Sequence, residues 1–225
     1  MSPKKPRNKG TLKATPRKPS RRIRIPRKVG LVRRLDRNAT ISNYMKMLFS
    51  KDVDSKIEAA FALGDFGVKS AIPALTRLLS HNEMWVRYAA IVALGQMAEP
   101  SSVTVLIKML RDENSSVKRV AIESLEKIGD PRAVKHILKL LNDRDLDVRI
   151  AAIESLKSFE DPDSLESLKK HLYDPESSVR YSAAKSLGEI GDKLVVEELR
   201  RVALYDPNVH VRVAAHNSIH QVTSS

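Results

Sequence analysis

The residues with the clearest chemistry are the Lys and Arg side chains of the N-terminal segment. Residues 1–38 contain fifteen Lys and Arg and one acid, Asp36, so this segment carries +14, whereas residues 39–225 sum to −1 and the whole chain carries +13. Cations at this density bind a phosphate backbone by releasing its condensed counterions. The side chains expected to contact phosphate are Lys4, Lys5, Arg7, Lys9, Lys13, Arg17, Lys18, Arg21, Arg22, Arg24, Arg27 and Lys28.

Proline and the scarcity of acids make a compact fold unfavourable in this segment, so it is predicted to be a disordered tail. SPKK at 2–5 and TPRK at 15–18 resemble a histone-tail motif that presents cations to the DNA minor groove. RRIRIPRK at 21–28 instead resembles the extensions of ribosomal proteins that thread between rRNA helices. Composition does not decide between DNA and RNA. A nuclear-import signal, a transit peptide and attachment to an anionic membrane surface stay open.

Patterns for catalysis and metal binding are sparse. The sequence has no cysteine, no phosphate-binding loop and no nucleophile elbow. His216 and His220 are four residues apart, which is compatible with a metal site on a helix. A polar cap on the last unit of the chain explains them more simply. We therefore predict no catalytic residue, no metal and no cofactor, and a protein that is not an enzyme.

The rest of the chain repeats every 31 residues. Val followed by Lys or Arg recurs from Val86 to Val211 at steps of 31, 31, 31 and 32 residues. An Ala stands three positions after each basic residue and a Leu or Ile seven positions after it, which is the spacing of one helical face. A second helical pattern precedes each of these, so each unit is predicted to be two antiparallel helices. The Ala column is Ala59, Ala90, Ala121, Ala152, Ala183 and Ala215.

A fixed period of this length predicts a solenoid, in which each helix pair buries its apolar face against its neighbours. The expected fold class is all-α: a right-handed α-solenoid of six helical hairpins with a disordered basic N-terminal tail. The expected domains are the tail at 1–38 and the solenoid at 39–225, with repeats near 41–67, 68–98, 99–129, 130–160, 161–191 and 192–223.

Two segments, VRYAAIVALGQM at 86–97 and VRYSAAKSLGEIG at 179–191, resemble the second helix of HEAT repeats. They resemble most closely the 31-residue subclass named after the phycobiliprotein lyases. The family includes scaffolds, lyases, hydroxylases and relatives of DNA glycosylases, so the resemblance predicts a fold and leaves the function open. Its deoxyhypusine hydroxylases hold iron with His-Glu pairs, and this sequence contains no His-Glu dipeptide. A lyase-type enzyme stays open as an alternative.

One repeated basic column is predicted to be structural. Four of its members stand six positions after an Asp, and the resemblance implies that such Asp and Arg side chains form a ladder joining the turns of successive repeats. Because His81 and Ser50 replace the Asp in the first two repeats, we expect a weaker ladder at that end. The expected ladder residues are Arg87, Asp112, Lys118, Asp143, Arg149, Asp174, Arg180, Asp206 and Arg212.

A second basic column is predicted to face solvent on the first helix of each pair. A binding role is one interpretation. Tolerance of Lys and Arg near a helix C-terminus is the favoured one, because acids elsewhere leave the array almost neutral. This column comprises Lys46, Arg77, Lys108, Lys139, Lys170 and Arg201.

An apolar cluster is expected on the inner face of the first two repeats, pointing away from the core. Exposed clusters of this kind are typical of contact sites for protein partners. Apolar residues of the tail, between 29 and 35, could cover it instead. The candidate partner-binding residues are Ile57, Phe61, Trp85, Tyr88 and Val92.

These patterns favour an adaptor that binds the backbone of DNA or RNA through its tail and an unidentified protein partner through the inner face. A protein-only scaffold with the tail as a targeting signal is the alternative from another class. No apolar run reaches the length of about 18 residues that a membrane span needs. We expect a monomeric cytoplasmic protein, associated with nucleoid or ribosome, or nuclear in a eukaryote.

Overall fold

A computed structural model describes residues 37–159 and 161–224. The predicted tail, apart from its last two residues, lies outside these described residues, and its boundary with the solenoid stays a prediction. Within the described ranges the chain forms α-helices and short 3-10 helices, with no strand. The helices are α1 (Arg37–Met47), α2 (Val53–Asp65), η1 (Lys69–Ala71), α3 (Ile72–Leu78), α4 (Met84–Met97), η2 (Pro100–Ser102), α5 (Val103–Met109), α6 (Ser115–Ile128), η3 (Pro131–Ala133), α7 (Val134–Ile137), η4 (Leu138–Asn142), α8 (Leu146–Leu156), α9 (Pro162–His171), α10 (Ser177–Ile190), η5 (Lys193–Val195), α11 (Val196–Tyr205) and α12 (Val209–Ser224).

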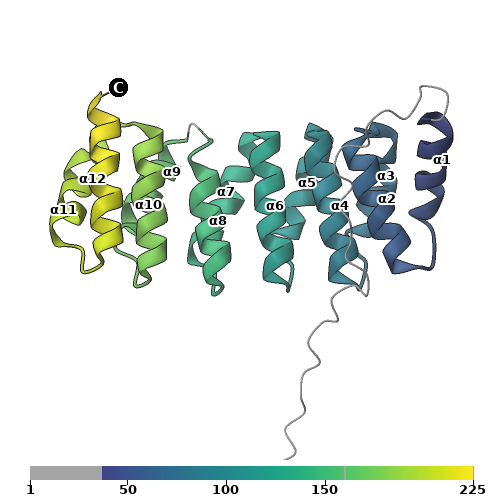
Figure 1. Cartoon of the computed structure of the whole chain (residues 1–225), viewed down its shortest axis with the longest axis horizontal. Coiled ribbons are helices and arrows are strands. Elements are labelled where there is room, and N and C mark those ends of the chain that lie inside the picture. The colour runs from purple at the N-terminus through teal and green to yellow at the C-terminus, as the bar shows by residue number, and fades with distance from the viewer. Residues whose placement is uncertain (1–36, 160, 225) are drawn as a thin grey trace, which may run out of the picture.

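Consecutive helices pair as hairpins, and the hairpins stack side by side along the long axis of the molecule (Figure 1). The second helices of the hairpins, α2, α4, α6, α8, α10 and α12, form one layer, which we call the inner layer. The first helices form the outer layer: α3, α5, α7, α9 and α11 lie behind the second helices in Figure 1, and α1 stands at the right-hand end of the stack. This arrangement confirms the predicted all-α solenoid of helical hairpins.

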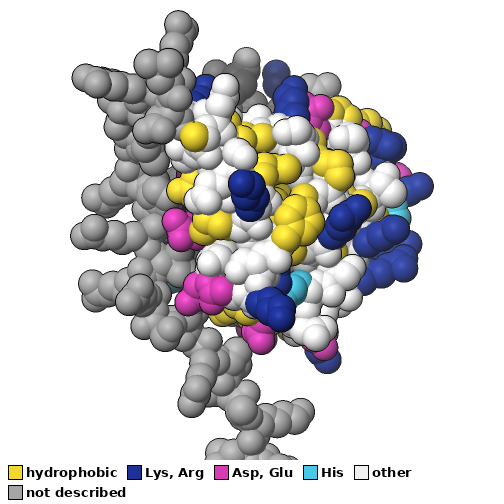
Figure 2. All heavy atoms as spheres, turned by 90° about the vertical axis from the view of Figure 1, so that its right-hand side faces the viewer, with side chains coloured by type: hydrophobic (Ala, Val, Ile, Leu, Met, Phe, Trp, Pro, Cys, Tyr) yellow, Lys and Arg dark blue, Asp and Glu magenta, His cyan; other side chains and the backbone are white. Residues whose placement is uncertain are grey.

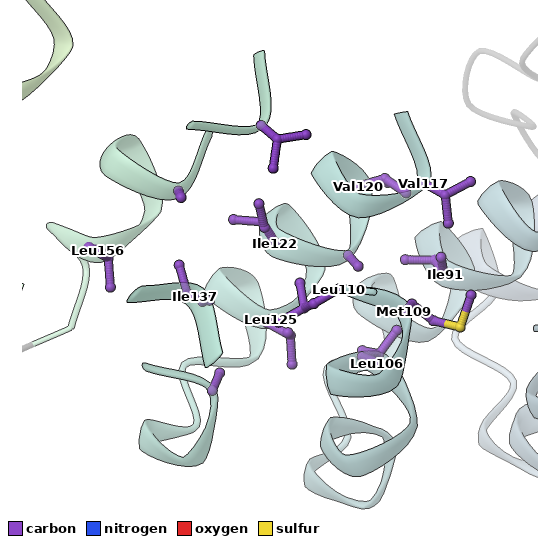
Figure 3. Packing of buried hydrophobic residues seen from close by; sticks show 14 of the residues in the cluster. Ile91, Leu106, Met109, Leu110, Val117, Val120, Ile122, Leu125, Ile137 and Leu156 are labelled. Atoms are coloured by element: carbon purple, nitrogen blue, oxygen red, sulfur yellow. The ribbon is translucent and has the colours of Figure 1, made fainter. Parts of the chain in front are cut away.

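The core runs continuously between the two layers. All six members of the Ala column are fully buried, which allows the neighbouring helices to approach closely. Larger side chains fill the space around them: Figure 3 shows Leu106 of α5, Ile122 and Leu125 of α6, and Ile137 of α7 packed together. Each hairpin therefore buries its apolar face mainly against the next hairpin, as the period of the sequence predicts.

The ends of the second helices follow from local backbone chemistry. The side chains of Asp52, Asn114 and Asp145 accept hydrogen bonds from backbone amides in the first turns of α2, α6 and α8. Gly129 ends α6 with a positive φ of 71°, a conformation that costs glycine little. Ala98 occupies the same position after α4 with a φ of 51°, which is strained for a residue with a β-carbon.

Candidate protein-binding groove

The ladder residues lie at the turns between the helices of each hairpin. Arg87 binds Asp112 of the next repeat through two hydrogen bonds, Nε to Oδ2 at 2.7 Å and Nη2 to Oδ1 at 2.8 Å. Arg180 binds Asp206 in the same way, at 2.7 and 3.0 Å. Lys118 Nζ lies 2.5 Å from Asp143 Oδ2. These pairs join the second repeat to the third, the third to the fourth and the fifth to the sixth.

The remaining arginines of the ladder differ in geometry. Arg149 Nε is 3.9 Å from Asp174 Oδ2, too far for a hydrogen bond, and this buried nitrogen has no hydrogen-bond partner among the described residues. The ladder contact between the fourth and fifth repeats is therefore weaker than the neighbouring ladder contacts. Arg212, in the last repeat, donates to the backbone carbonyl of Asp206 within its own turn.

At the N-terminal end of the ladder, Lys56 Nζ lies 3.4 Å from His81 Nε2. Burial, followed by the Lys56 charge, lowers the pKa of His81. At this position a neutral imidazole replaces the carboxylate of the other repeats, so Lys56 has no opposite charge to pair with in the ladder.

Burial alone would raise the pKa of the Asp206 carboxyl. Hydrogen bonds from Arg180 and from the backbone amide of Asn208 outweigh it and hold the pKa below its usual value. Burial also acts on Asp143, where the hydrogen bond from Lys118 and the amide of Asp145 again produce a lowered pKa. Both carboxylates are therefore stabilised as anions in the folded protein.

Contacts between neighbouring inner-layer helices differ along the solenoid. A β-carbon added to Gly95 of α4 would lie 2.4 Å from Ser124 Oγ of α6, and Ser124 Oγ donates to the backbone carbonyl of Ile91 at 3.2 Å. Gly188 of α10 and Ser218 of α12 repeat this arrangement, with an added β-carbon again 2.4 Å from the hydroxyl. The α4/α6 and α10/α12 junctions are thus closed by a glycine and a serine.

The corresponding glycine position holds Glu126 in α6 and Lys157 just after α8. Ser155, which aligns with Ser124, donates to the carbonyl of Ala152 in its own helix at 3.0 Å, whereas Ser124 donates to a carbonyl of the preceding inner helix. A cavity of about 160 Å³ lies between α6 and α8, and one of about 250 Å³ between α8 and α10. Charged side chains at the glycine position therefore coincide with open junctions.

The two cavities adjoin each other, because Glu126 and Glu154 line both of them. We call this pair of cavities the inner groove. Its charged lining consists of Arg119, Glu123, Glu126, Asp147, Glu154, Lys157, Lys185 and Glu189. Five acids and three bases give this lining a net negative charge.

The bases of the inner groove are largely engaged by acids. Lys157 forms an ion pair with Glu189, and this hydrogen bond, partly opposed by burial, raises the pKa of Lys157. Lys185 Nζ is 3.7 Å from Glu189 Oε1. By contrast, no ion pair within the described ranges engages the carboxylate of Glu154 or Asp147. Both of these acidic residues are exposed.

The predicted apolar cluster needs one correction. Ile57 is 2% exposed and belongs to the core, so the prediction that it points away from the core is wrong. Ile57, Ala60 and Gly64 share one face of α2, and Gly64 lies against Ala93 of α4, so this face packs into the α2/α4 junction. The other four predicted residues are half-buried against the core.

Within that cluster, the rings of Trp85 and Tyr88 pack edge to face with centroids 5.7 Å apart. A contact of these residues with a protein partner stays a prediction. Part of this surface is accordingly used for packing.

Sequence reasoning missed an exposed aromatic pair near the C-terminus. Tyr173 is 60% and Tyr205 is 79% exposed, and both line a cavity of about 820 Å³ together with Arg201 and Pro207. Each Tyr stands directly before a ladder Asp, where the second, third and fourth repeats have Ser, Arg and Asn. A comparison of the residues that precede the ladder position in successive repeats would have revealed these two tyrosines.

The structure also describes the C-terminal histidines. The rings of His216 and His220 pack edge to face with centroids 4.9 Å apart. No group of three or more His, Asp or Glu residues in the described part of the chain could hold a metal ion.

None of the described helices is both long and apolar enough to cross a membrane.

Comparison with protein families agrees with this architecture. A family model of HEAT repeats matches residues 43–126 and 103–179, and a model of the single HEAT repeat matches residues 165–194. The chain is a HEAT-repeat protein. No curated protein matches its sequence significantly.

Solved structures with the same fold include engineered and natural proteins. One engineered protein is 24% identical, with a TM-score of 0.57 over 82% of this chain and 97% of its own. The CpcE and CpcF complex of phycocyanin lyase from Nostoc sp. PCC7120 is 20% identical, with a TM-score of 0.51 over 84% of each chain. A designed armadillo repeat protein in complex with the peptide (KR)4 is 17% identical, with a TM-score of 0.59 over 81% of this HEAT-repeat chain and 99% of its own.

Proposed function

We propose that this HEAT-repeat protein is a non-enzymatic adaptor that holds a basic segment of a protein partner in its inner groove and contacts nucleic acid through its tail. The observation that carries the first part is the replacement of glycine by Glu126 and Lys157 at the two open junctions. At closed junctions the same position brings helices together. Here it contributes charged side chains to a groove.

Charge supports a basic ligand for this groove. The lining has a surplus of carboxylates, and Glu154, which borders both cavities, has no ion-pair partner within the described ranges. A Lys or Arg side chain placed between Glu126 and Glu154 would gain charge-assisted hydrogen bonds in a partly enclosed site. The basic peptide bound by the designed armadillo neighbour is a ligand of the same chemical class.

The groove can be tested with a synthetic peptide of alternating Lys and Arg. In a full-length background with the twelve tail cations changed to Gln, Glu154→Lys should weaken peptide binding at least about tenfold, which corresponds to about 1.4 kcal/mol. Glu113→Lys is the matched control, because Glu113 is exposed, lies outside the groove and has the same charge. Equal loss in the two variants, measured by fluorescence anisotropy, would contradict the groove as the binding site.

Nucleic-acid binding by the tail is proposed from its charge. If about six to ten of its cations contact phosphates, affinity should fall by about 10³ to 10⁵ between 50 and 200 mM salt. The test compares the wild-type chain with the full-length variant in which the twelve tail cations are Gln, using a DNA duplex and a structured RNA. A variant that binds both probes as tightly as the wild type would remove this part of the proposal and leave a protein-only scaffold.

A further inference from the structure

The outer layer of the first four repeats has an unusual charge distribution. The helices α1, α3, α5 and α7, with η4, carry six Lys and Arg and no Asp or Glu. The outer helices α9 and α11 instead carry four acids, and their bases Lys169 and Arg200 form ion pairs with Glu166 and Glu197. Net positive charge on this layer is therefore concentrated at the N-terminal two thirds of the solenoid.

Four cations of these helices, together with Arg111 in the turn after α5, form what we call the outer ridge. All are exposed, and no ion pair engages any of them within the described ranges, in contrast to the ladder bases of the inner layer. Lys135 and Lys139 are four positions apart on consecutive helical turns, a spacing at which like charges repel. The ridge comprises Arg77, Lys108, Arg111, Lys135 and Lys139.

Two further observations indicate a positive potential at this surface. Burial lowers the pKa of His136, and the charges of Lys135, Lys139 and Arg111 lower it further. Seen from the α1 end, Lys and Arg gather along the edge formed by the outer layer, and several Asp and Glu lie toward the opposite edge (Figure 2). The two layers therefore differ in electrostatic character.

We propose that the outer ridge is a second phosphate-binding surface, which takes the backbone of a nucleic acid. The inference builds on the proposed nucleic-acid binding by the tail but depends on different residues. Neighbouring helices in such a stack are about 10 Å apart. The ridge therefore presents at least one cation on each successive outer helix, at intervals of about 10 Å. A polymer with regularly spaced phosphates can contact the cations of several outer helices at once, whereas a small anion can contact those of only one helix.

The composition of the ridge favours nucleic acid over a membrane. Surfaces that bind membranes combine cations with large apolar side chains that enter the lipid. The exposed large hydrophobic side chains of the described residues include Phe49, Tyr173, Leu204 and Tyr205, and none belongs to α3, α5 or α7. The ridge thus offers charge without an apolar anchor.

The test uses charge reversal in the full-length chain. Arg77→Glu, Lys108→Glu and Lys139→Glu, combined, are compared with a control triple variant, Lys51→Glu, Lys127→Glu and Lys193→Glu. The control makes the same change in net charge at exposed residues that form no ion pair with any other described residue. Both triple variants are made with the natural tail and with the Gln-substituted tail. The probes are a DNA duplex, a structured RNA and vesicles containing an anionic phospholipid, each titrated across a salt series.

We expect the ridge variant to lose at least about tenfold in affinity for nucleic acid in both tail backgrounds, with the salt slope reduced by about 0.9 for each lost contact. The control should change affinity by less than about threefold. A charge-preserving variant, Arg77→Lys with Lys108→Arg and Lys139→Arg, should bind like the parent. Binding of the nucleic acid should also raise the pKa of His136, measured by NMR titration, because phosphate offsets the neighbouring cations.

Each other outcome has a definite meaning. Equal loss in the ridge variant and its control would show an effect of net charge alone and overturn the ridge. Loss of vesicle binding with unchanged nucleic-acid binding would assign the surface to membranes and overturn it as well. A Gln-substituted tail that leaves affinity unchanged would contradict the tail proposal, while the comparison between ridge and control would still decide the ridge. Unchanged thermal unfolding of each variant excludes loss of the fold as the cause.

Discussion

The junctions at the middle of the solenoid differ from those toward its ends. At α4/α6 and α10/α12, a glycine faces a serine whose hydroxyl bonds across the junction, and bidentate Arg-Asp pairs join the adjacent turns. At α8/α10, Lys157 replaces the glycine and Arg149 lies 3.9 Å from its aspartate. Repeats of the same 31-residue period therefore form two kinds of junction. The residue at the position of Gly95 and Gly188 distinguishes a closed junction from an open one.

The largest expected contrast concerns the ladder. Asp206→Asn should lower the free energy of unfolding by about 3–5 kcal/mol, because it leaves the Arg180 guanidinium buried without its counter-charge. Asp174→Asn should cost only about 1 kcal/mol, because Arg149 makes no hydrogen bond to that carboxylate. Chemical denaturation of both variants measures the difference. Equal losses would show that the two joints are energetically alike.

A β-carbon at a closed junction gives the next effect. Gly188→Ala should destabilise the protein by about 1–3 kcal/mol, because its β-carbon would lie 2.4 Å from Ser218 Oγ and 2.9 Å from the Ser218 backbone. Lys157→Ala, at the open junction, should change stability by less than about 1 kcal/mol. Thermal unfolding of both variants provides the measurement, and a neutral Gly188→Ala would contradict the proposed close contact.

The pH dependence of stability should follow the same contrast. The pKa of Asp206 is lower in the folded protein than in the unfolded chain, so its contribution is present above the unfolded pKa and is lost as pH falls through the folded pKa. Asp206→Asn should therefore flatten the decline of stability below about pH 4. An acid titration of unfolding, with Asp174→Asn as control, checks this. Parallel curves for wild type and Asp206→Asn would argue against the lowered pKa.

The smallest expected effect lies at the end of α4. Ala98 has a φ of 51°, whereas Gly67, Gly129 and Gly191 occupy the same position in three other repeats. Ala98→Gly should stabilise the protein by about 0.5–1 kcal/mol, because removing the β-carbon relieves the left-handed conformation by more than the added freedom of the unfolded chain costs. A lower melting temperature in this variant would contradict that balance.

Much of the fold could be predicted from periodicity, because each repeat obeys the same local rules. The columns of Val, Ala and Leu specify which face is buried, and Gly129 marks a helix end. The site was less predictable. Ile57 is buried because the face of α2 that carries it packs against α4. Which face does so depends on the orientation of adjacent helices, and the residue types do not specify it.

The inner groove likewise results from how three neighbouring helices pack. Its only trace in the sequence is the exchange of Gly for Glu126 and Lys157, which has no meaning until the column is known to face a junction. The longer distance from Arg149 to Asp174 leaves no trace in residue type, because the same pair forms a close contact elsewhere in the ladder.

The long separation at Arg149 also affects how the molecule responds to a pulling force. Units that touch only their neighbours carry a load in series, so extension begins where neighbouring helices pack least extensively, which among the described inner helices is the α8/α10 junction. Stretched by its two ends, the protein should therefore first separate between α8 and α10, leaving two blocks intact on either side of the break.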